Sequence, residues 1–127
     1  MVSDLKVNMT LQGASGKTYF FNLFGYSTFD QLKNAFKPLA AIYVFSQRYV
    51  SEDTYTHHLL YLGQTSDLAT RFDSHHKENE ITAYYGNCIW IHVFNGSEKE
   101  REEAEKDILA SYDFPCNEVN NEMDTEI

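Results

Sequence analysis

Three short apolar runs constrain the fold of this chain most strongly: residues 40–47, 58–64 and 88–94. Each is rich in β-branched or aromatic side chains, a pattern typical of buried strands. The runs are too short to span a bilayer as helices. The chain has 127 residues, of which nineteen are aromatic, which suffices for a single domain with one modest core.

Two β-hairpins are expected around these runs. The first joins residues 6–11 to residues 18–24 across Gly13-Ala14-Ser15-Gly16, where two glycines bracket a polar turn. The second joins the first two apolar runs through a long polar loop, residues 48–57. The third run supplies a further core strand that ends at Asn95-Gly96.

Capping signals predict three helices. They are expected over residues 29–36 after Ser27 or Thr28, from Thr65-Ser66-Asp67 to about Lys77, and from the capping box Ser97-x-x-Glu100 to about Tyr112. The core order is therefore ββαβα. The predicted class is α+β: a small antiparallel β-sheet flanked by helices, with an N-terminal hairpin and a short helix.

Two tripeptides in the first two runs carry tyrosines, Ala41-Ile42-Tyr43 and Tyr61-Leu62-Gly63. Tyrosine is common in strands, so each tripeptide alone shows little. If the strands pair with both tyrosines on one face, their hydroxyls can converge beside one phosphate. An unperturbed phenol has a pKa near 10, so a nearby metal or arginine would have to assist it as a base.

Arg71 and His75 are four residues apart in the expected second helix and would share one face of it. A fixed guanidinium can meet two oxygens of a phosphate as negative charge builds up there. His75 could orient a nucleophile or donate a proton. Arg71 could instead be a solvated surface charge, and the neighbouring His76 competes with His75 for the same role.

In this order the motifs resemble the GIY-YIG nuclease family over residues 40–118. The segment Leu68-x-x-Arg71-x-x-x-His75 resembles the family's Leu-x-x-Arg-x-x-x-His helix, and Glu105-x-x-Ile108-Leu109 resembles its Glu-x-x-Leu-Ile segment. Pro115-Cys116-Asn117 resembles the Pro-x-Asn ending of the last helix. The chain departs from the family in having Ala41 for Gly, Leu62 for Ile and a longer spacing between the two tyrosines.

The resemblance implies a metal-dependent DNA endonuclease that uses Mg²⁺ or Mn²⁺. Its implied catalytic residues are Tyr43, Tyr61, Arg71, His75, Glu105 and Asn117, with Glu105 as the metal ligand and Gly63 shaping the site. Two alternatives stay open from the residues themselves: a surface pair of Glu105 with Arg101, and Asn117 as a turn residue bonded to its own backbone.

The net charge of −9 opposes tight DNA binding by the isolated chain. Residues 97–127 carry −8 of this charge and residues 1–96 only −1, so a neutral or basic cleft is compatible with it. Residues 1–39 are expected to form an N-terminal extension, 40–118 the nuclease core and 119–127 an acidic tail. The charge keeps two alternatives open: a non-catalytic module that binds a protein or nucleic acid, and a nuclease subunit recruited to DNA by a basic partner.

Other features indicate a cytoplasmic protein without a membrane partner. The N-terminus lacks the pattern of a secretion signal, and the two cysteines form neither a disulfide framework nor a zinc spacing. His57-His58 and His75-His76 suggest zinc, but adjacent histidines in a strand or helix point apart, so zinc is not expected. A protein partner or a homodimer stays open.

Overall fold

The computed structural model describes residues 7–117. The start of the first expected strand and the acidic tail expected over residues 119–127 lie outside this range. The strands are β1 (Asn8–Gln12), β2 (Thr18–Gly25), β3 (Ala41–Ser51), β4 (Thr54–Thr65) and β5 (Cys88–Val93).

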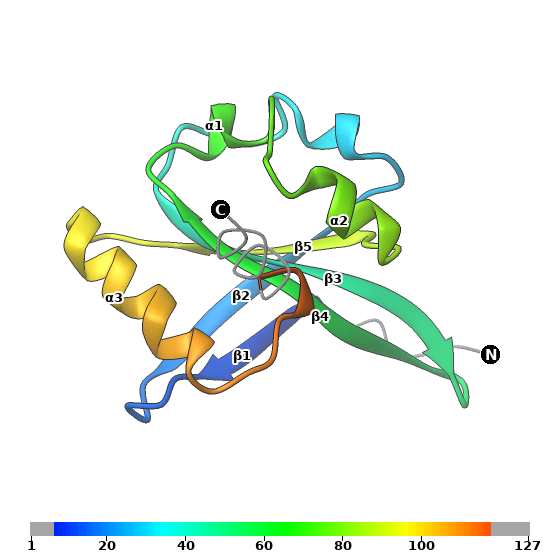
Figure 1. Cartoon of the computed structure of the whole chain (residues 1–127), viewed down its shortest axis with the longest axis horizontal. Helices are drawn as coiled ribbons and strands as arrows, with labels where there is room; N and C mark the ends of the chain where they lie inside the picture. The colour runs from blue at the N-terminus through cyan, green and yellow to red at the C-terminus, as the bar shows by residue number, and fades with distance from the viewer. Residues whose placement is uncertain (1–6, 118–127) are drawn as a thin grey trace, which may run out of the picture.

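The five strands form one curled antiparallel sheet in the order β1-β2-β5-β3-β4 (Figure 1). β3 lies between β4 and β5, and the N-terminal hairpin joins the same sheet because β2 pairs with β5. The predicted α+β class is therefore confirmed, and all three apolar runs are strands.

Helical segments accompany the sheet, and those whose full bounds fall within residues 7–117 are given next. They are a 3-10 helix (η1, Phe29–Leu32), α1 (Leu68–Arg71), α2 (Glu78–Ala83) and α3 (Glu98–Leu109). Asp67 caps α1 by accepting the backbone N–H of Ala69, and the predicted capping box opens α3 through Ser97 and Glu100. None of the helices within residues 7–117 is long and apolar enough to cross a membrane.

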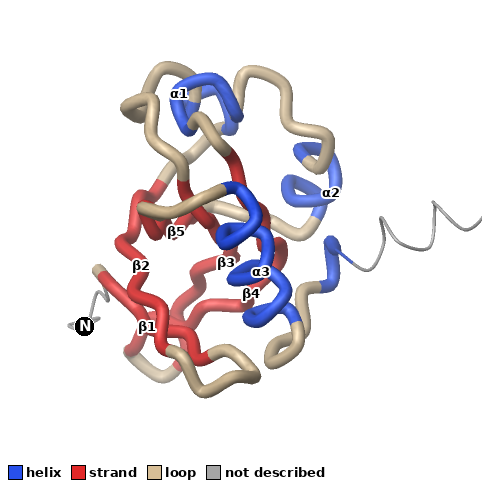
Figure 2. Tube along the Cα trace, turned by 90° about the vertical axis from the view of Figure 1, so that its left-hand side faces the viewer, coloured by secondary structure: helices blue, strands red, loops and turns tan. Residues whose placement is uncertain are grey.

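Both faces of the sheet are covered. Successive residues of β3 point to opposite faces, so its side chains contribute to two separate clusters. Tyr43 and Phe45 pack with η1, α1 and α2, whereas Ile42 and Val44 pack with α3. Figure 2 shows α3 running alongside the strands, apart from α1 and α2. The face that carries Tyr43 is thus the face that α1 and α2 cover.

The expected long loop over residues 48–57 is wrong. β3 and β4 stay paired to their ends and turn through Glu52 and Asp53, both with positive φ, as in a two-residue type I′ turn. Residues 49 and 50 and residues 54–56 are all aromatic or β-branched, and such side chains sustain a ladder despite the polar composition of the segment. The hairpin consequently projects from the body of the protein (Figure 1).

The helix expected to run to Lys77 is also wrong. α1 ends at Arg71, and the chain turns so that Phe72 is buried against Phe36 and Phe45. Asp73 and Ser74, which favour turns, follow.

Two other helices are shorter than expected. The segment expected as a helix over residues 29–36 is the single 3-10 turn η1, and Asn34 has a positive φ that breaks helical continuation. The last helix ends at Leu109, with Ala110 as its C-cap, and not at Tyr112.

Candidate active site

Tyr43 and Tyr61 lie on the same face of the sheet. Tyr43 is in register with Gly63, and Tyr61 is in register with Phe45 two residues along β3. The centroids of the two tyrosine rings are 6.2 Å apart. The pairing register therefore brings both side chains to one place, as the sequence pattern required.

His75 is hydrogen-bonded to the first tyrosine. Its Nε2 lies 2.8 Å from the Tyr43 hydroxyl oxygen, and its Nδ1 accepts the backbone N–H of Lys77 at 3.0 Å. Since Nδ1 is an acceptor, the proton of the neutral ring is on Nε2 and is donated to Tyr43. The Tyr43 hydroxyl oxygen thus accepts from His75, and its own proton is available for a hydrogen bond to another acceptor.

The charge state of His75 agrees with this tautomer. The ring is only 5 % exposed, and burial lowers the pKa of His75 to about 3, assisted by the positive charges of Arg71, His76 and Lys77. His75 is thus a neutral hydrogen-bond donor at physiological pH, which is at odds with a role in giving up a proton.

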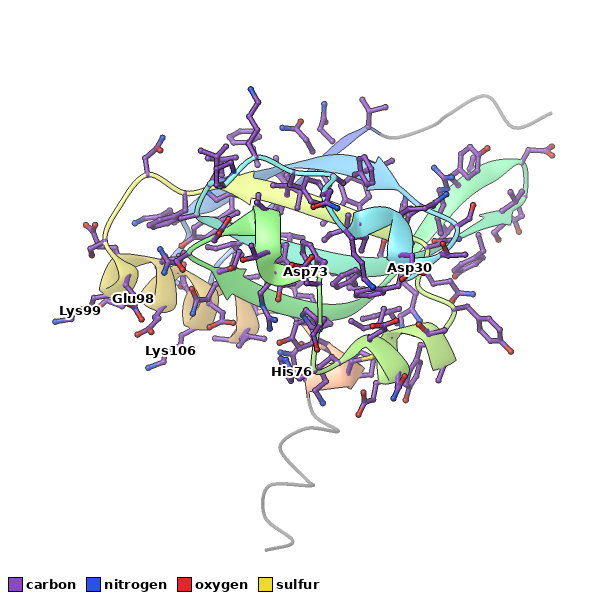
Figure 3. The ribbon with its side chains drawn as sticks, turned by 90° about the horizontal axis from the view of Figure 1, so that it is seen from above. Asp30, Asp73, His76, Glu98, Lys99 and Lys106 are labelled. Atoms are coloured by element: carbon purple, nitrogen blue, oxygen red, sulfur yellow. The ribbon has the colours of Figure 1, made fainter. Side chains whose placement is uncertain are left out.

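Arg71 and His75 do not share a helix face, because α1 ends before His75. Arg71 instead donates from Nη2 to Nδ1 of His76 at 3.2 Å, and Nε2 of His76 lies 3.5 Å from the Tyr61 hydroxyl. His76 lies exposed between α1 and α2 on this face of the molecule (Figure 3). It is a site residue that the sequence pattern alone did not identify.

The two histidine rings stack, with centroids 4.9 Å apart and planes 17° apart. The expectation that adjacent histidines point apart is wrong here, because it assumed regular secondary structure and these residues lie in a turn. The hydroxyl of Tyr43 lies within hydrogen-bonding distance of His75 and that of Tyr61 within hydrogen-bonding distance of His76. The adjacency of His75 and His76 shortly after Arg71 was the sequence signal that could have identified His76.

Both tyrosines are protonated, and two opposite charges affect their pKa values. Burial raises the pKa of Tyr61 to about 12 and raises the pKa of Tyr43 still further above its ordinary value. The charge of Arg71 lowers both pKa values and the charge of Glu105 raises both, without cancelling burial. The pKa values of both hydroxyls thus respond to the charges of Arg71 and Glu105.

Glu105 is a half-buried carboxylate on α3. Burial raises its pKa, and the charge of Glu102 raises it further. Within residues 7–117 its side chain has no hydrogen bond or ion pair; Arg101, the alternative partner, donates from Nε to Gln64 Oε1 at 2.6 Å. A half-buried carboxylate without a donor in the described part of the chain favours a cation beside it.

These residues fit a hard divalent cation held by one carboxylate. No group of three or more His, Cys, Asp or Glu side chains that could hold a metal is found in the described range. Mg²⁺ characteristically keeps several waters and takes one or two protein carboxylates together with substrate phosphates. Glu105 would be that carboxylate.

Asn117 braces the strand that carries Tyr61 and Gly63. Its Oδ1 accepts the backbone N–H of Leu62 at 2.9 Å, and its Nδ2 donates to the Leu62 carbonyl at 3.0 Å. Leu62 lies between Tyr61 and Gly63 on an edge strand, whose backbone groups would otherwise lack partners. The structure thus gives Asn117 a contact that positions β4, and its side chain bonds Leu62 instead of its own backbone.

Searches of protein-family models, of curated proteins and of solved structures found no match to this chain.

Proposed function

We propose that this protein is a metal-dependent endonuclease that hydrolyses DNA phosphodiester bonds at the Tyr43–Tyr61 site. One observation carries the proposal: two buried tyrosine hydroxyls meet on one face of the sheet, and Arg71 is linked to them through its hydrogen bond with His76. The pKa values of both hydroxyls, which the charge of Arg71 lowers and the charge of Glu105 raises, support it. Metal-dependent cleavage of a phosphodiester uses a positive charge that binds the phosphate oxygens and a carboxylate that holds the metal, both at the same site.

Each side chain has a role that follows from its contacts. Arg71 would bind two phosphate oxygens, and its bond to His76 limits its orientation. Tyr43, which accepts from His75, would donate a hydrogen bond from its own hydroxyl to a water or to a phosphate oxygen and so hold it in place. When bound at Glu105, Mg²⁺ or Mn²⁺ would stabilise the negative charge that develops on the phosphate.

The raised tyrosine pKa values determine how Tyr43 acts in the free protein. A buried phenol with a raised pKa is protonated at neutral pH, so it positions water by hydrogen bonding and is not a resting base. The N–H of His75 and the charge of Arg71 would both stabilise partial negative charge on the phenol oxygen if its proton moves during reaction.

The net charge of −9 favours a second candidate, a module on the same scaffold that binds a partner without cleaving DNA, or a nuclease subunit brought to DNA by a basic partner. The charge predicts weak DNA affinity for the isolated chain. It does not explain the placement of Arg71 and Glu105 around two buried hydroxyls, which is why hydrolysis is preferred.

The test is nicking of supercoiled plasmid at low salt with Mg²⁺ or Mn²⁺. The wild-type protein should nick the plasmid, and chelator should stop the reaction. Glu105→Gln should fold and lose activity, whereas Glu103→Gln, an exposed neighbour on the same helix, should retain it. Equal activity of the wild type and Glu105→Gln would overturn the assignment.

A further inference from the structure

A groove of about 350 Å³ opens on the same face of the sheet as Tyr43, over β2 and β5. Its walls come from the two strands, from the segment after η1 and from the start of α1. The side chains that matter are Asn22, Phe24, Phe36, Lys37, Leu39 and Val93.

The groove lies beside the candidate active site on the same face of the sheet, although none of the candidate site residues lines it. Tyr43 is in register with Ile91 of β5, and Ile91 is in register with Asn22 of β2, so the three side chains form one row across the sheet. Neighbouring strands are about 4.8 Å apart, which puts Asn22 about 10 Å from Tyr43 along the row. Leu68, which lines the groove, begins the helix that ends at Arg71.

Large apolar side chains are unusually exposed around this groove. Phe24 is 37 % exposed, Leu39 42 % and Val93 44 %, and they come from three separate segments. Phe20, two residues before Asn22 and on the same side of β2, is 67 % exposed. Apolar exposure gathered in a concave patch indicates a binding site more than scattered surface residues do.

The polar groups of the groove fit a nucleotide. The amide of Asn22 makes no hydrogen bond within the described residues, and it offers both a donor and an acceptor, as the edge of a nucleobase requires. The apolar and aromatic walls suit the faces of a flat ring. Lys37 supplies a positive charge for a phosphate of the same strand.

We propose that this groove binds an unpaired base of the nucleic-acid strand that is cut at the Tyr43 site. The identity of the ligand rests on the proposed function, because the groove continues the row of the candidate phosphate site. A base within an intact duplex is paired and stacked and cannot enter a concave groove without leaving the stack. The substrate class is therefore DNA with a single-stranded segment next to the scissile bond, such as a flap, gap or loop.

The test is binding at low salt in the presence of chelator, so that the outcome does not depend on cleavage. Fluorescence anisotropy compares a labelled oligothymidylate with an abasic oligomer that has the same number of phosphates. The wild-type protein should bind the oligothymidylate roughly fivefold to a hundredfold more tightly, as expected when one base stacks on a protein surface.

Two exposed valines in strands provide a matched pair of variants. Val93→Asp places a carboxylate in the groove and should abolish the preference for the oligomer with bases. Val50→Asp makes the same change on the projecting β3–β4 hairpin and should leave that preference intact. Asn22→Ala, at an exposed position, should weaken the preference and gives a second measurement if Val93→Asp folds poorly.

Equal affinity of the wild type for the two oligomers, or an unchanged preference in both groove variants, would overturn the base site. That outcome is distinct from failure of the proposed function, which would show as absent nicking activity. A preference that disappears in the groove variants would support the base site whether or not the protein cuts DNA.

Discussion

Gly63 lies directly opposite Tyr43 in the sheet, and a Cβ at Gly63 would lie 2.6 Å from both Cζ and the hydroxyl oxygen of Tyr43. The same Cβ would lie 2.8 Å from Cε2 of Tyr61. The missing side chain therefore creates the space in which the two phenols lie. This requirement gives Gly63 a steric role at the site, as distinct from a need for an unusual backbone conformation.

The first prediction is that Gly63→Ala displaces Tyr43 and abolishes most of the nicking activity. The added methyl group should also destabilise the fold by about 1–3 kcal/mol, as overpacking of a filled core does. Gly25→Ala is the matched control, because a Cβ there has nothing nearer than 3.9 Å. Denaturant unfolding and nicking assays on both variants measure the two effects, and wild-type behaviour of Gly63→Ala would contradict the steric role.

The second prediction concerns acid stability and His75. Its pKa is 6.5 in the unfolded chain and about 3 in the folded protein, so between these values the unfolded state binds more protons. The stabilisation is fully present above pH 6.5 and is lost as the pH falls from 6.5 toward 3. For this one group the loss is about 2 kcal/mol between pH 7 and pH 5.

His75→Gln removes the titrating ring but keeps a side-chain N–H to offer to Tyr43. Its free energy of unfolding should therefore depend less on pH over this range than that of the wild type. The measurement is denaturant unfolding of both proteins at several pH values from 7 to 5. Parallel pH dependences for the two proteins would contradict the lowered pKa.

Several features of the fold follow from local sequence rules. The three apolar runs, the turn at Gly16 and the cap residues Asp67 and Ser97 each depend on neighbours in the chain, and the structure confirms them. Helix length after Asp67 was not predictable in this way. It depends on the burial of Phe72, a tertiary effect that overrides helical periodicity.

In the candidate site, too, some features follow from the sequence pattern and others depend on tertiary contacts. That Tyr43 and Tyr61 share a face follows from pairing register, which the sequence pattern anticipates. The contact of Arg71 with His76 depends on a turn whose geometry no spacing rule describes. Likewise, Asn117 is an acceptor and donor for Leu62 only because residues far apart in sequence meet at the edge of the sheet.

The third prediction is that Arg71→Lys lowers the rate of DNA cleavage about 10²-fold, comparable to the loss of one transition-state hydrogen-bond donor. Lysine keeps the charge but lacks the planar fork with which a guanidinium meets two phosphate oxygens. DNA affinity, measured with chelator present, should change much less than the rate. A rate within about threefold of the wild type would assign Arg71 to the solvated surface.

The fourth prediction tests how the N-terminal hairpin is held to α3. The carboxylate of Asp107 accepts from the Ser15 N–H at 2.8 Å, the Ser15 hydroxyl at 2.7 Å and the Tyr19 hydroxyl at 2.8 Å. The bonds from Ser15 hold the pKa of Asp107 below its usual range. Asp107→Asn should therefore lower the melting temperature at pH 7 more than Glu103→Gln does.

The lowered pKa of Asp107 also predicts how the stability of the fold depends on pH. A lowered folded-state pKa means that the contribution of Asp107 is present above its unfolded pKa, near 3.8, and is lost as the pH falls through the folded value. The difference in melting temperature between wild type and Asp107→Asn should hence shrink in strong acid. A difference that stays constant down to pH 3 would exclude the carboxylate as the source.

The last prediction concerns the negative charge of the tail. It rests on the sequence alone, because residues 118–127 lie outside the described range. Deletion of residues 120–127 removes Glu122, Asp124 and Glu126 and changes the net charge from −9 to −6. If these charges repel phosphate near the site, the truncated protein should bind DNA more tightly at low salt, and the gain should fade as salt rises because ions screen the repulsion. Binding measured over a salt series on both proteins tests this. An affinity unchanged at every salt concentration would contradict repulsion by the tail.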